Sequence, residues 1–165
     1  MIKQIETERL VIREVKSSDA PSILKLFNQE DCLKYIGDKG IRTIEDAENY
    51  ITSGPIKSYQ EHGLGLLAVS KDDKFIGLCG LLKREEFESP DLGFAFLQPF
   101  YGKGYAFEAS KGVLLQNKNM HKIIALTHLE NTASISLLKK LGFNHRGTIA
   151  FGENKEPSHY FELIN

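Results

Sequence analysis

The chain has 165 residues, of which 41% are apolar and 26% charged, and its formal net charge is −1 at pH 7. These values are typical of one globular domain with a core of its own, so we expect a single domain over 1–165. A charge near zero argues against a general nucleic-acid binder or a membrane-surface protein, because both need a basic excess. The N-terminus lacks the apolar region of a signal peptide, and no apolar run is long enough to span a membrane. We therefore expect a cytoplasmic protein.

The two cysteines, Cys32 and Cys79, lie far apart in the chain and match no metal-ligand spacing. We expect both to be reduced, partly buried thiols. The sequence predicts no metal site.

The first third of the chain predicts one strand over 9–15 and helices over 17–28 and 43–51. The strand segment is rich in branched residues, and each helix opens on a hydroxyl cap ahead of an apolar face. We expect 54–55 (Gly-Pro) to interrupt the second helix, with a short helical piece continuing to about His62.

From residue 65 onward, short apolar runs and turn signals predict a strand-rich region. The expected elements are strands over 65–70, 74–84 and 91–98, a helix over 105–119, a strand over 122–129, a helix over 131–141 ended by Gly142, and final strands over 145–151 and 158–164. No repeat or linker divides this series. The order predicts a mixed α+β fold with an antiparallel meander, then a helical crossover between two parallel, adjacent strands.

The stretch FYGKGYAFEA at 100–109 places Gly102 and Gly104 between a strand end and a helix start. Glycines there let N–H groups converge on an anion, and the helix N-terminus adds about half a positive charge. Lys103 adds a mobile cation. A phosphate-bearing ligand is one interpretation, and a plain loop that eases entry into the helix is the other. Phe107 replaces the third glycine of the dinucleotide pattern, and no Gly-Lys-Ser/Thr completes a P-loop.

This stretch resembles the pyrophosphate-binding loop of the GNAT superfamily of N-acetyltransferases, and more narrowly its RimJ/RimL-like (ribosomal-protein N-terminal acetyltransferase) branch. ETERLVIREV at 6–15 resembles the opening strand of that branch, and LENTASISLLKKLGF at 129–143 resembles its second signature. The three stretches lie in the same order and at suitable separations, so the resemblance covers essentially the whole chain. The resemblance implies a twisted mixed sheet with an antiparallel meander, a splayed parallel strand pair and flanking helices. It also implies acetyl-CoA as cosubstrate and a primary amine as acceptor.

The resemblance implies that free backbone groups of Phe96 and Leu97 pair with the pantetheine arm, and that N–H groups of the glycine turn cradle the pyrophosphate. The implied cofactor-binding residues are Phe96, Leu97, Tyr101, Gly102, Lys103, Gly104, Tyr105, Ala106, Asn131 and Ser134. Tyr101 stands where the superfamily commonly has Gln or Arg. Asn131 is explained equally well as the N-cap of the next helix, and Glu108 as a carboxylate in a first helical turn.

Asp91 and Ser134 are the catalytic candidates. Asp91 opens the strand at 91–98, where the branch often carries Glu, and would take the amine's proton through water; an exposed strand-end charge is the alternative. In many relatives a Tyr protonates the departing thiolate, and Leu138 occupies the corresponding position in this chain. Leu cannot donate a proton, so the remaining possibilities are Ser134, a water molecule or no general acid. His128 could line the same pocket. A weak base suits an α-amine of pKa about 7.7–8.0 better than a Lys amine of about 10.4.

We expect direct acetyl transfer in a ternary complex, to a protein N-terminal α-amine or a small-molecule amine. No cysteine lies near the site in sequence, so a covalent acetyl-enzyme is not expected. An acidic rim from residues between 33 and 60 would suit a cationic acceptor, but helix-surface charges explain these residues as well: Asp38, Glu45, Asp46 and Glu48. The alternative function is a catalytically weak CoA-binding sensor or interaction domain. Both a monomer and a homodimer remain open.

Overall fold

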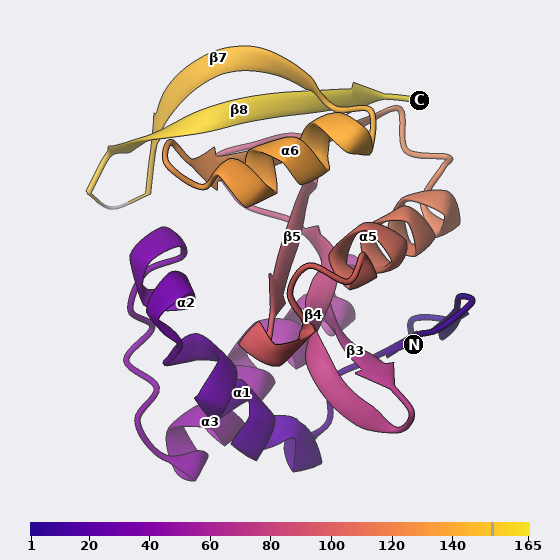
Figure 1. Ribbon diagram of the computed structural model, residues 1–165, viewed down its shortest axis with the longest axis vertical. Coiled ribbons are helices and arrows are strands. Elements are labelled where there is room, and N and C mark those ends of the chain that lie inside the picture. The colour runs from indigo at the N-terminus through magenta and orange to yellow at the C-terminus, as the bar shows by residue number, and fades with distance from the viewer. Residues whose placement is uncertain (153) are drawn as a thin grey trace.

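The computed structural model describes residues 1–152 and 154–165, apart from the side chain of residue 151. Within them, eight strands form one sheet in the order β1-β2-β3-β4-β5-β6-β8-β7 (Figure 1). The strands are β1 (Ile5–Glu6), β2 (Val11–Arg13), β3 (Leu66–Lys71), β4 (Lys74–Leu82), β5 (Asp91–Phe96), β6 (Lys122–His128), β7 (Asn144–Phe151) and β8 (Glu156–Ile164). The helices are α1 (Ala20–Phe27), α2 (Glu30–Tyr35), α3 (Ile44–Ile51), α4 (Lys57–His62), α5 (Tyr105–Gln116) and α6 (Thr132–Lys140), with short turns η1 (Ser17–Asp19), η2 (Thr52–Ile56) and η3 (Gln98–Phe100).

The expected mixed α+β fold is confirmed. Strands β1 to β5 pair antiparallel, β5 and β6 pair parallel, and β8 lies antiparallel between β6 and β7. The crossover from β5 through α5 to β6 therefore joins adjacent parallel strands, as the order of elements predicts.

Helices cover both faces of this sheet. On one face α1 and α3 bury a core that includes Leu26, Ala47 and Leu78 of β4. On the other face α5 packs over a core that includes Val113 and Leu81 of β4. Leu78 and Leu81 fall on opposite faces because successive side chains of a strand alternate in direction. Figure 1 shows α1 to α3 gathered in its lower part and α6 beside β7 and β8 at the top.

The parallel pair separates soon after it begins. Only Asp91 of β5 and Ile124 of β6 are in register, and the Ile124 N–H donates to the carbonyl of Pro90 at 2.9 Å. Beyond this point the two strands diverge toward their carboxyl ends. The sheet therefore opens at the end where α5 begins.

Local sequence signals account for the helix ends. Thr43 and Asp46 form the expected capping box, in which the Asp46 N–H donates to Thr43 Oγ1 at 3.0 Å. Gly142 ends α6 with a φ of +97°, and the Phe143 N–H donates back to the Leu138 carbonyl at 3.0 Å. This is the geometry of a Schellman motif, which a residue with a Cβ adopts only with strain.

One prediction about the helical region is wrong, and one helix was not predicted. Gly54 and Pro55 do not interrupt the helix, because α3, η2 and α4 follow one another without a break and η2 is a π-helical turn that contains Pro55. The longer loop of a π turn accommodates a residue that has no N–H to donate. The sequence also gave no sign of α2, whose six residues are too few for a helical period to stand out.

Candidate active site

A groove of about 1040 Å³ occupies the opening between β5 and β6. Its walls come from these strands, the glycine turn, the starts of α5 and α6, and α2 with the segment that follows it. Most of the predicted site residues line it: Asp91, Phe96, Tyr101, Gly102, Gly104, Tyr105, Ala106, Asn131 and Ser134. Two described residues of the predicted set, Leu97 and Lys103, lie outside its lining.

The glycine turn presents a bare helix start to this groove. Gly102 and Gly104 have φ angles of +71° and +81°, in the left-handed region that favours glycine. Gly104 is the N-cap of α5 and has no side chain with which to cap the first N–H groups of that helix. These N–H groups and the helix dipole are the elements from which proteins build anion sites.

Arg9 and Glu108 brace the turn from behind. Glu108 Oε1 accepts from Arg9 Nε at 2.6 Å, and Glu108 Oε2 accepts from Thr7 Oγ1 at 2.5 Å. Arg9 Nη1 donates to the Lys103 carbonyl at 3.0 Å, and the guanidinium lies 4.5 Å from the centre of the Tyr105 ring. Burial opposes ionisation of Glu108, but the hydrogen bonds from Thr7 and Arg9 outweigh it and lower its pKa. The structural interpretation of Glu108 is confirmed.

The backbone expectation for Leu97 is wrong. Its N–H donates to the Ile76 carbonyl at 2.9 Å, and its carbonyl accepts from the Phe100 N–H at 2.9 Å. Because N–H groups alternate in direction along a strand, that of Phe96 points away from β4 and toward the groove. The Phe96 carbonyl, by contrast, already accepts from Gln29 Nε2 at 3.1 Å.

Asp91 lies at the point where the two strands part. The residue is only 4% exposed, so the interpretation as an exposed strand-end charge is wrong. Arg84 Nε donates to Asp91 Oδ1 at 3.0 Å. Burial raises the pKa of the Asp91 carboxyl, and the Arg84 guanidinium opposes the rise. A carboxyl shifted in this direction is a better proton acceptor near neutral pH than an ordinary one.

The start of α6 forms the facing wall. Asn131 Oδ1 accepts from the Ser134 N–H at 3.1 Å, which confirms Asn131 as the N-cap. Asn131 and Ser134 also line the groove, as does Leu138, which stands where many relatives have a proton donor. The hydroxyl of Ser134 is one of the proton-donating side chains that α6 presents to the groove, together with those of Thr132 and Lys140.

Helix α2, which the sequence did not predict, closes the mouth of the groove. The Tyr35 ring lies 5.2 Å from that of His128, and Lys34 Nζ lies 3.7 Å from Glu130 Oε2 across the opening. His128 lines the groove as expected, and its Nδ1 accepts from the Glu130 N–H at 3.0 Å. Beside the glycine turn, burial and nearby Asp31 raise the pKa of Tyr101 to about 12.

Both cysteines are free and buried, as expected. Cys32 of α2 lines the groove, however, although it lies far from the glycine turn and from Asp91 in the sequence. Burial raises the pKa of the Cys32 thiol. Since the thiolate is the nucleophilic form, Cys32 is poorly suited to carry an acetyl group.

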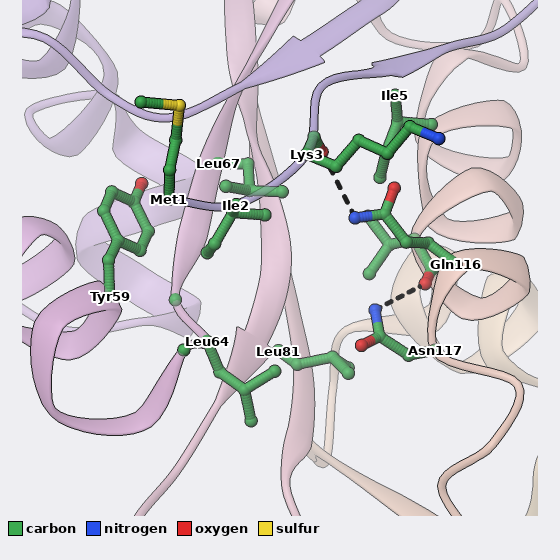
Figure 2. Close-up of a pocket in the computed structure, with 13 residues that line it drawn as sticks. Met1, Ile2, Lys3, Ile5, Tyr59, Leu64, Leu67, Leu81, Gln116 and Asn117 are labelled. Atoms are coloured by element: carbon green, nitrogen blue, oxygen red, sulfur yellow. Dashed lines mark hydrogen bonds between the residues drawn. The ribbon is translucent and has the colours of Figure 1, made fainter.

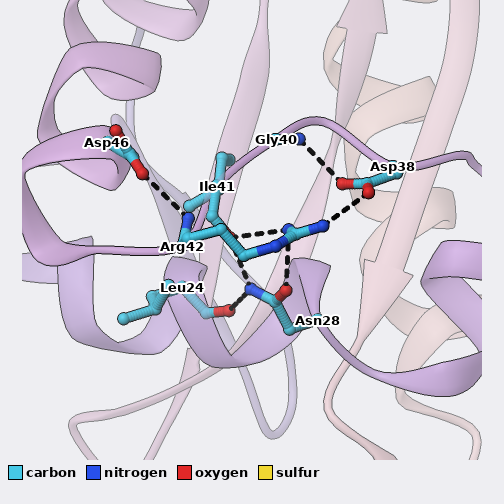
Figure 3. Close-up of polar contacts among 7 residues, drawn as sticks. All are labelled: Leu24, Asn28, Asp38, Gly40, Ile41, Arg42 and Asp46. Carbon is cyan, nitrogen blue, oxygen red and sulfur yellow. Dashed lines mark hydrogen bonds and ion pairs between the residues drawn. The ribbon is translucent and has the colours of Figure 1, made fainter.

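The acidic residues between 33 and 60 serve other purposes than a groove rim. Asp38 Oδ2 lies 2.5 Å from Arg42 Nη2, and Asp46 Oδ2 accepts from the Arg42 N–H at 2.9 Å (Figure 3). Asn28 completes this cluster by donating to the Leu24 and Ile41 carbonyls. In the structure as described, these two aspartates lie outside the groove lining, together with Glu45 and Glu48.

A second cavity, of about 250 Å³, lies at the N-terminus near Met1, Tyr59 and Gln116 (Figure 2). It contains none of the predicted site residues. Within the described part of the chain, no three metal-ligating side chains cluster. Over the same residues, no helix has both the length and the apolar character needed to cross a bilayer.

Comparison with solved structures defines the class of protein. An acetyltransferase of the GNAT family from Bacillus anthracis superposes with a TM-score of 0.80 at 24% identity, covering 98% of both chains. RimL, a ribosomal alpha-N-protein acetyltransferase solved in complex with coenzyme A, superposes with a TM-score of 0.84 at 12% identity and the same coverage. The fold is therefore that of an acetyltransferase.

The sequence itself identifies the family. Residues 9–144 match the model of the acetyltransferase (GNAT) domain, and the chain belongs to that family. YnaD of Bacillus subtilis, described as an uncharacterized N-acetyltransferase, is 29% identical over 146 residues, which are 87% of this chain and 84% of YnaD.

Proposed function

We propose that this chain is an acetyl-CoA-dependent N-acetyltransferase of the RimJ/RimL-like branch, acting in the cytoplasm on a protein N-terminal α-amine or a small-molecule amine. The observation that carries the proposal is the bare start of α5 at the mouth of the opening between β5 and β6. Uncapped N–H groups with a positive helix end suit a pyrophosphate. The inward N–H of Phe96 offers a partner to an extended pantetheine arm in the same groove.

The reaction that these residues suit is direct transfer in a ternary complex. The neutral amine attacks the thioester carbonyl and passes one proton through water to Asp91. The oxyanion that develops is held by a strand N–H near Phe96. The carbon–sulfur bond then breaks, and the thiolate takes a proton from water, either directly or relayed through the Ser134 hydroxyl, which regains its proton from water; with a thiol pKa of about 8.5, the thiolate needs only a weak acid.

Acetyl transfer itself is the test. The protein is incubated with acetyl-CoA and a panel of peptides, polyamines and amino compounds, while free thiol and product mass are followed. We expect thiol release that depends on one class of amine, with the product heavier by one acetyl group. Binding of acetyl-CoA without thiol release for any amine would favour the alternative function, a CoA-binding sensor. Leu138, which lines the groove where a proton donor would be expected, is the observation that favours this alternative.

A thermal shift tests the premise that both functions share. A ligand at a hundredfold excess over its dissociation constant adds about 2.7 kcal/mol to the free energy of unfolding. We expect CoA and acetyl-CoA to raise the melting temperature. An unmoved melting curve at millimolar ligand would contradict the assignment of the glycine turn.

A further inference from the structure

The side-chain amide of Gln29 binds the free edge of β5 at its carboxyl end. Gln29 Nε2 donates to the Phe96 carbonyl at 3.1 Å, and Gln29 Oε1 accepts from the Gln98 N–H at 2.7 Å. Both backbone groups point away from β4, because the Leu97 N–H between them donates to the Ile76 carbonyl and successive residues of a strand alternate in direction. One side chain therefore takes the place that a neighbouring strand would have along this part of β5.

Gln29 itself is firmly placed. It lies in the turn between α1 and α2, 67 residues before Phe96 in the chain. As the N-cap of α2 it accepts from the Leu33 N–H at 3.0 Å, and its own N–H donates to the Leu26 carbonyl at 3.2 Å. Its half-buried amide also lies 3.9 Å from Cys32 Sγ. Among the described residues, Gln29 is not one of those that line the groove, so it acts on the groove through the backbone of β5.

The bonds to Gln29 determine which backbone donor β5 offers to the groove at this end. The inward N–H of Gln98 is taken by Gln29, whereas at Phe96 only the carbonyl is. The register of β5 with β6 is confined to Asp91 and Ile124, so strand pairing supplies no acceptor for the Phe96 N–H. The N–H and carbonyl of one strand residue point to the same side, so the bond that holds the Phe96 carbonyl also fixes the direction of its N–H.

A donor that stabilises developing charge is effective when its position is fixed before the reaction, to within about 0.5 Å. Without Gln29, the end of β5 would be held by β4 alone, and a strand end that is bound on one edge opens more readily than one bound on both.

We propose that Gln29 is a positioning residue for acetyl transfer. Its amide fixes the carboxyl end of β5, so that the Phe96 N–H is held in place for the thioester end of acetyl-CoA. This inference rests on the proposed function. Gln29 touches neither the cosubstrate nor the reacting atoms.

The variant Gln29→Met removes both hydrogen bonds, because Met is similar in length but has no N–H to donate and no oxygen to accept with. We expect kcat/KM for acetyl-CoA to fall about tenfold, with the KM of the amine unchanged and a single cooperative melting transition retained. Gln116→Met is the matched control, because Gln116 Nε2 also donates to a backbone carbonyl distant in the chain, that of Lys3 at 3.2 Å, beside the second cavity. It should keep the kcat/KM of the wild type.

The variant Gln29→Glu separates positioning from packing, since the two side chains have the same shape. An ionised carboxylate still accepts from the Gln98 N–H but turns its second oxygen toward the Phe96 carbonyl, which repels it. The protonated carboxyl can donate to that carbonyl again. We expect kcat/KM for acetyl-CoA, taken as a ratio to the wild type at the same pH, to be about tenfold low at about pH 8 and to recover at about pH 5. A loss of packing alone would give the same ratio at both pH values.

A Gln29→Met variant as active as Gln116→Met would overturn this inference alone, and so would a Gln29→Glu variant whose ratio to the wild type does not change with pH. Absence of thiol release by the wild-type protein with every amine would overturn the proposed function, and this inference with it.

Discussion

Asp91 combines burial with an ion pair to Arg84, a combination that is poor for stability and useful for proton transfer. Because the folded protein raises its pKa above the ordinary 3.8, the ionised form is less favourable in the fold than in water. The unfolding free energy therefore gains nothing from this charge at neutral pH. A residue whose charge does not stabilise the fold is a candidate for a role in chemistry.

We predict that Asp91→Asn lowers kcat/KM for the preferred amine about 100-fold without lowering the melting temperature. A base must be unprotonated, so the wild-type rate falls further as the pH drops through the raised pKa of Asp91, and the variant loses this part of the acidic limb while the part set by protonation of the amine remains in both. A pH–rate profile and a melting curve check both parts. Glu86→Gln is the control, since Glu86 acts on Asp91 only through its charge. An unchanged rate at every pH would remove Asp91 from the mechanism.

Ser134→Ala tests the proton donor. If the hydroxyl stabilises the departing thiolate, its removal costs one hydrogen bond to a charged group, and we expect kcat to fall about tenfold at pH 7 with KM unchanged. Ser136→Ala is the matched control for Ser134→Ala, because Ser136 lies two residues further along α6 and is exposed. Equal kcat values for the two variants would leave protonation to water.

At the scale of elements, the junction between β5 and α5 depends on backbone conformation. Gly104→Ala places a Cβ on a residue with a φ of +81°, which costs about 1 kcal/mol of unfolding free energy, and only 3.4 Å from Arg9 Nη2. Gly63→Ala carries the same backbone cost at φ +66° and leaves open space around its Cβ, at the end of α4. We expect both variants to be destabilised and only Gly104→Ala to lose CoA affinity, by about tenfold or more in a titration. Equal CoA affinities would contradict the anion site.

The hydrogen bonds between Arg9, Glu108 and the glycine turn lead to a separate prediction. Arg9 joins Glu108 to the Lys103 carbonyl, so Arg9→Met and Glu108→Gln remove parts of one network. We expect each to weaken CoA binding several-fold, and the double variant to be no worse than the more severe single one. Additive losses in Kd would show that the two residues act independently.

Elements that are specified locally could be predicted from the sequence, and those specified by distant contacts could not. The capping box at Thr43, the Gly142 helix end and the hairpin turn at Asp72–Asp73, with its positive φ angles, each need only a few neighbouring residues. Helix α2 is too short to show a period, and it is held by contacts with residues about ninety positions away, such as that of Tyr35 with His128.

The candidate site divides in the same way. The glycine turn and Asn131 carry local signatures, and the structure brings both to one groove. The role of Arg9 could not be predicted, because its partner Glu108 is 99 residues distant in the chain. The sequence marked Arg9 only as a member of the opening-strand stretch.

For the whole molecule, the lowered pKa values set the response to acid. Arg13 donates to both carboxylate oxygens of Asp19 at 2.9 Å, and despite burial these bonds lower the pKa of Asp19, as those to Glu108 do for that residue. The folded state then binds fewer protons than the unfolded chain, so stability is complete above the ordinary values of 3.8 and 4.5 and falls as the pH drops below them.

We predict that the unfolding free energy falls as the pH drops below about 4.5 in denaturant titrations. Asp19→Asn should cost about 2 kcal/mol at pH 7 and flatten this decline. Asp73→Asn, in the exposed turn between β3 and β4, should do neither. Parallel stability curves for Asp19→Asn and the wild type would contradict the role of the Arg13 pair.

The separation of β5 and β6 leaves two strand edges facing each other inside the molecule. A free edge offers backbone donors and acceptors to any extended chain that reaches it, and it is where sheets recruit foreign strands and aggregate. Here both edges face inward, with α2, α5 and α6 around the opening, so a slender ligand can enter more readily than another polypeptide. A ligand bound in the groove covers the two free strand edges. We therefore expect the protein to aggregate sooner when it is stored without ligand than when it is stored with it.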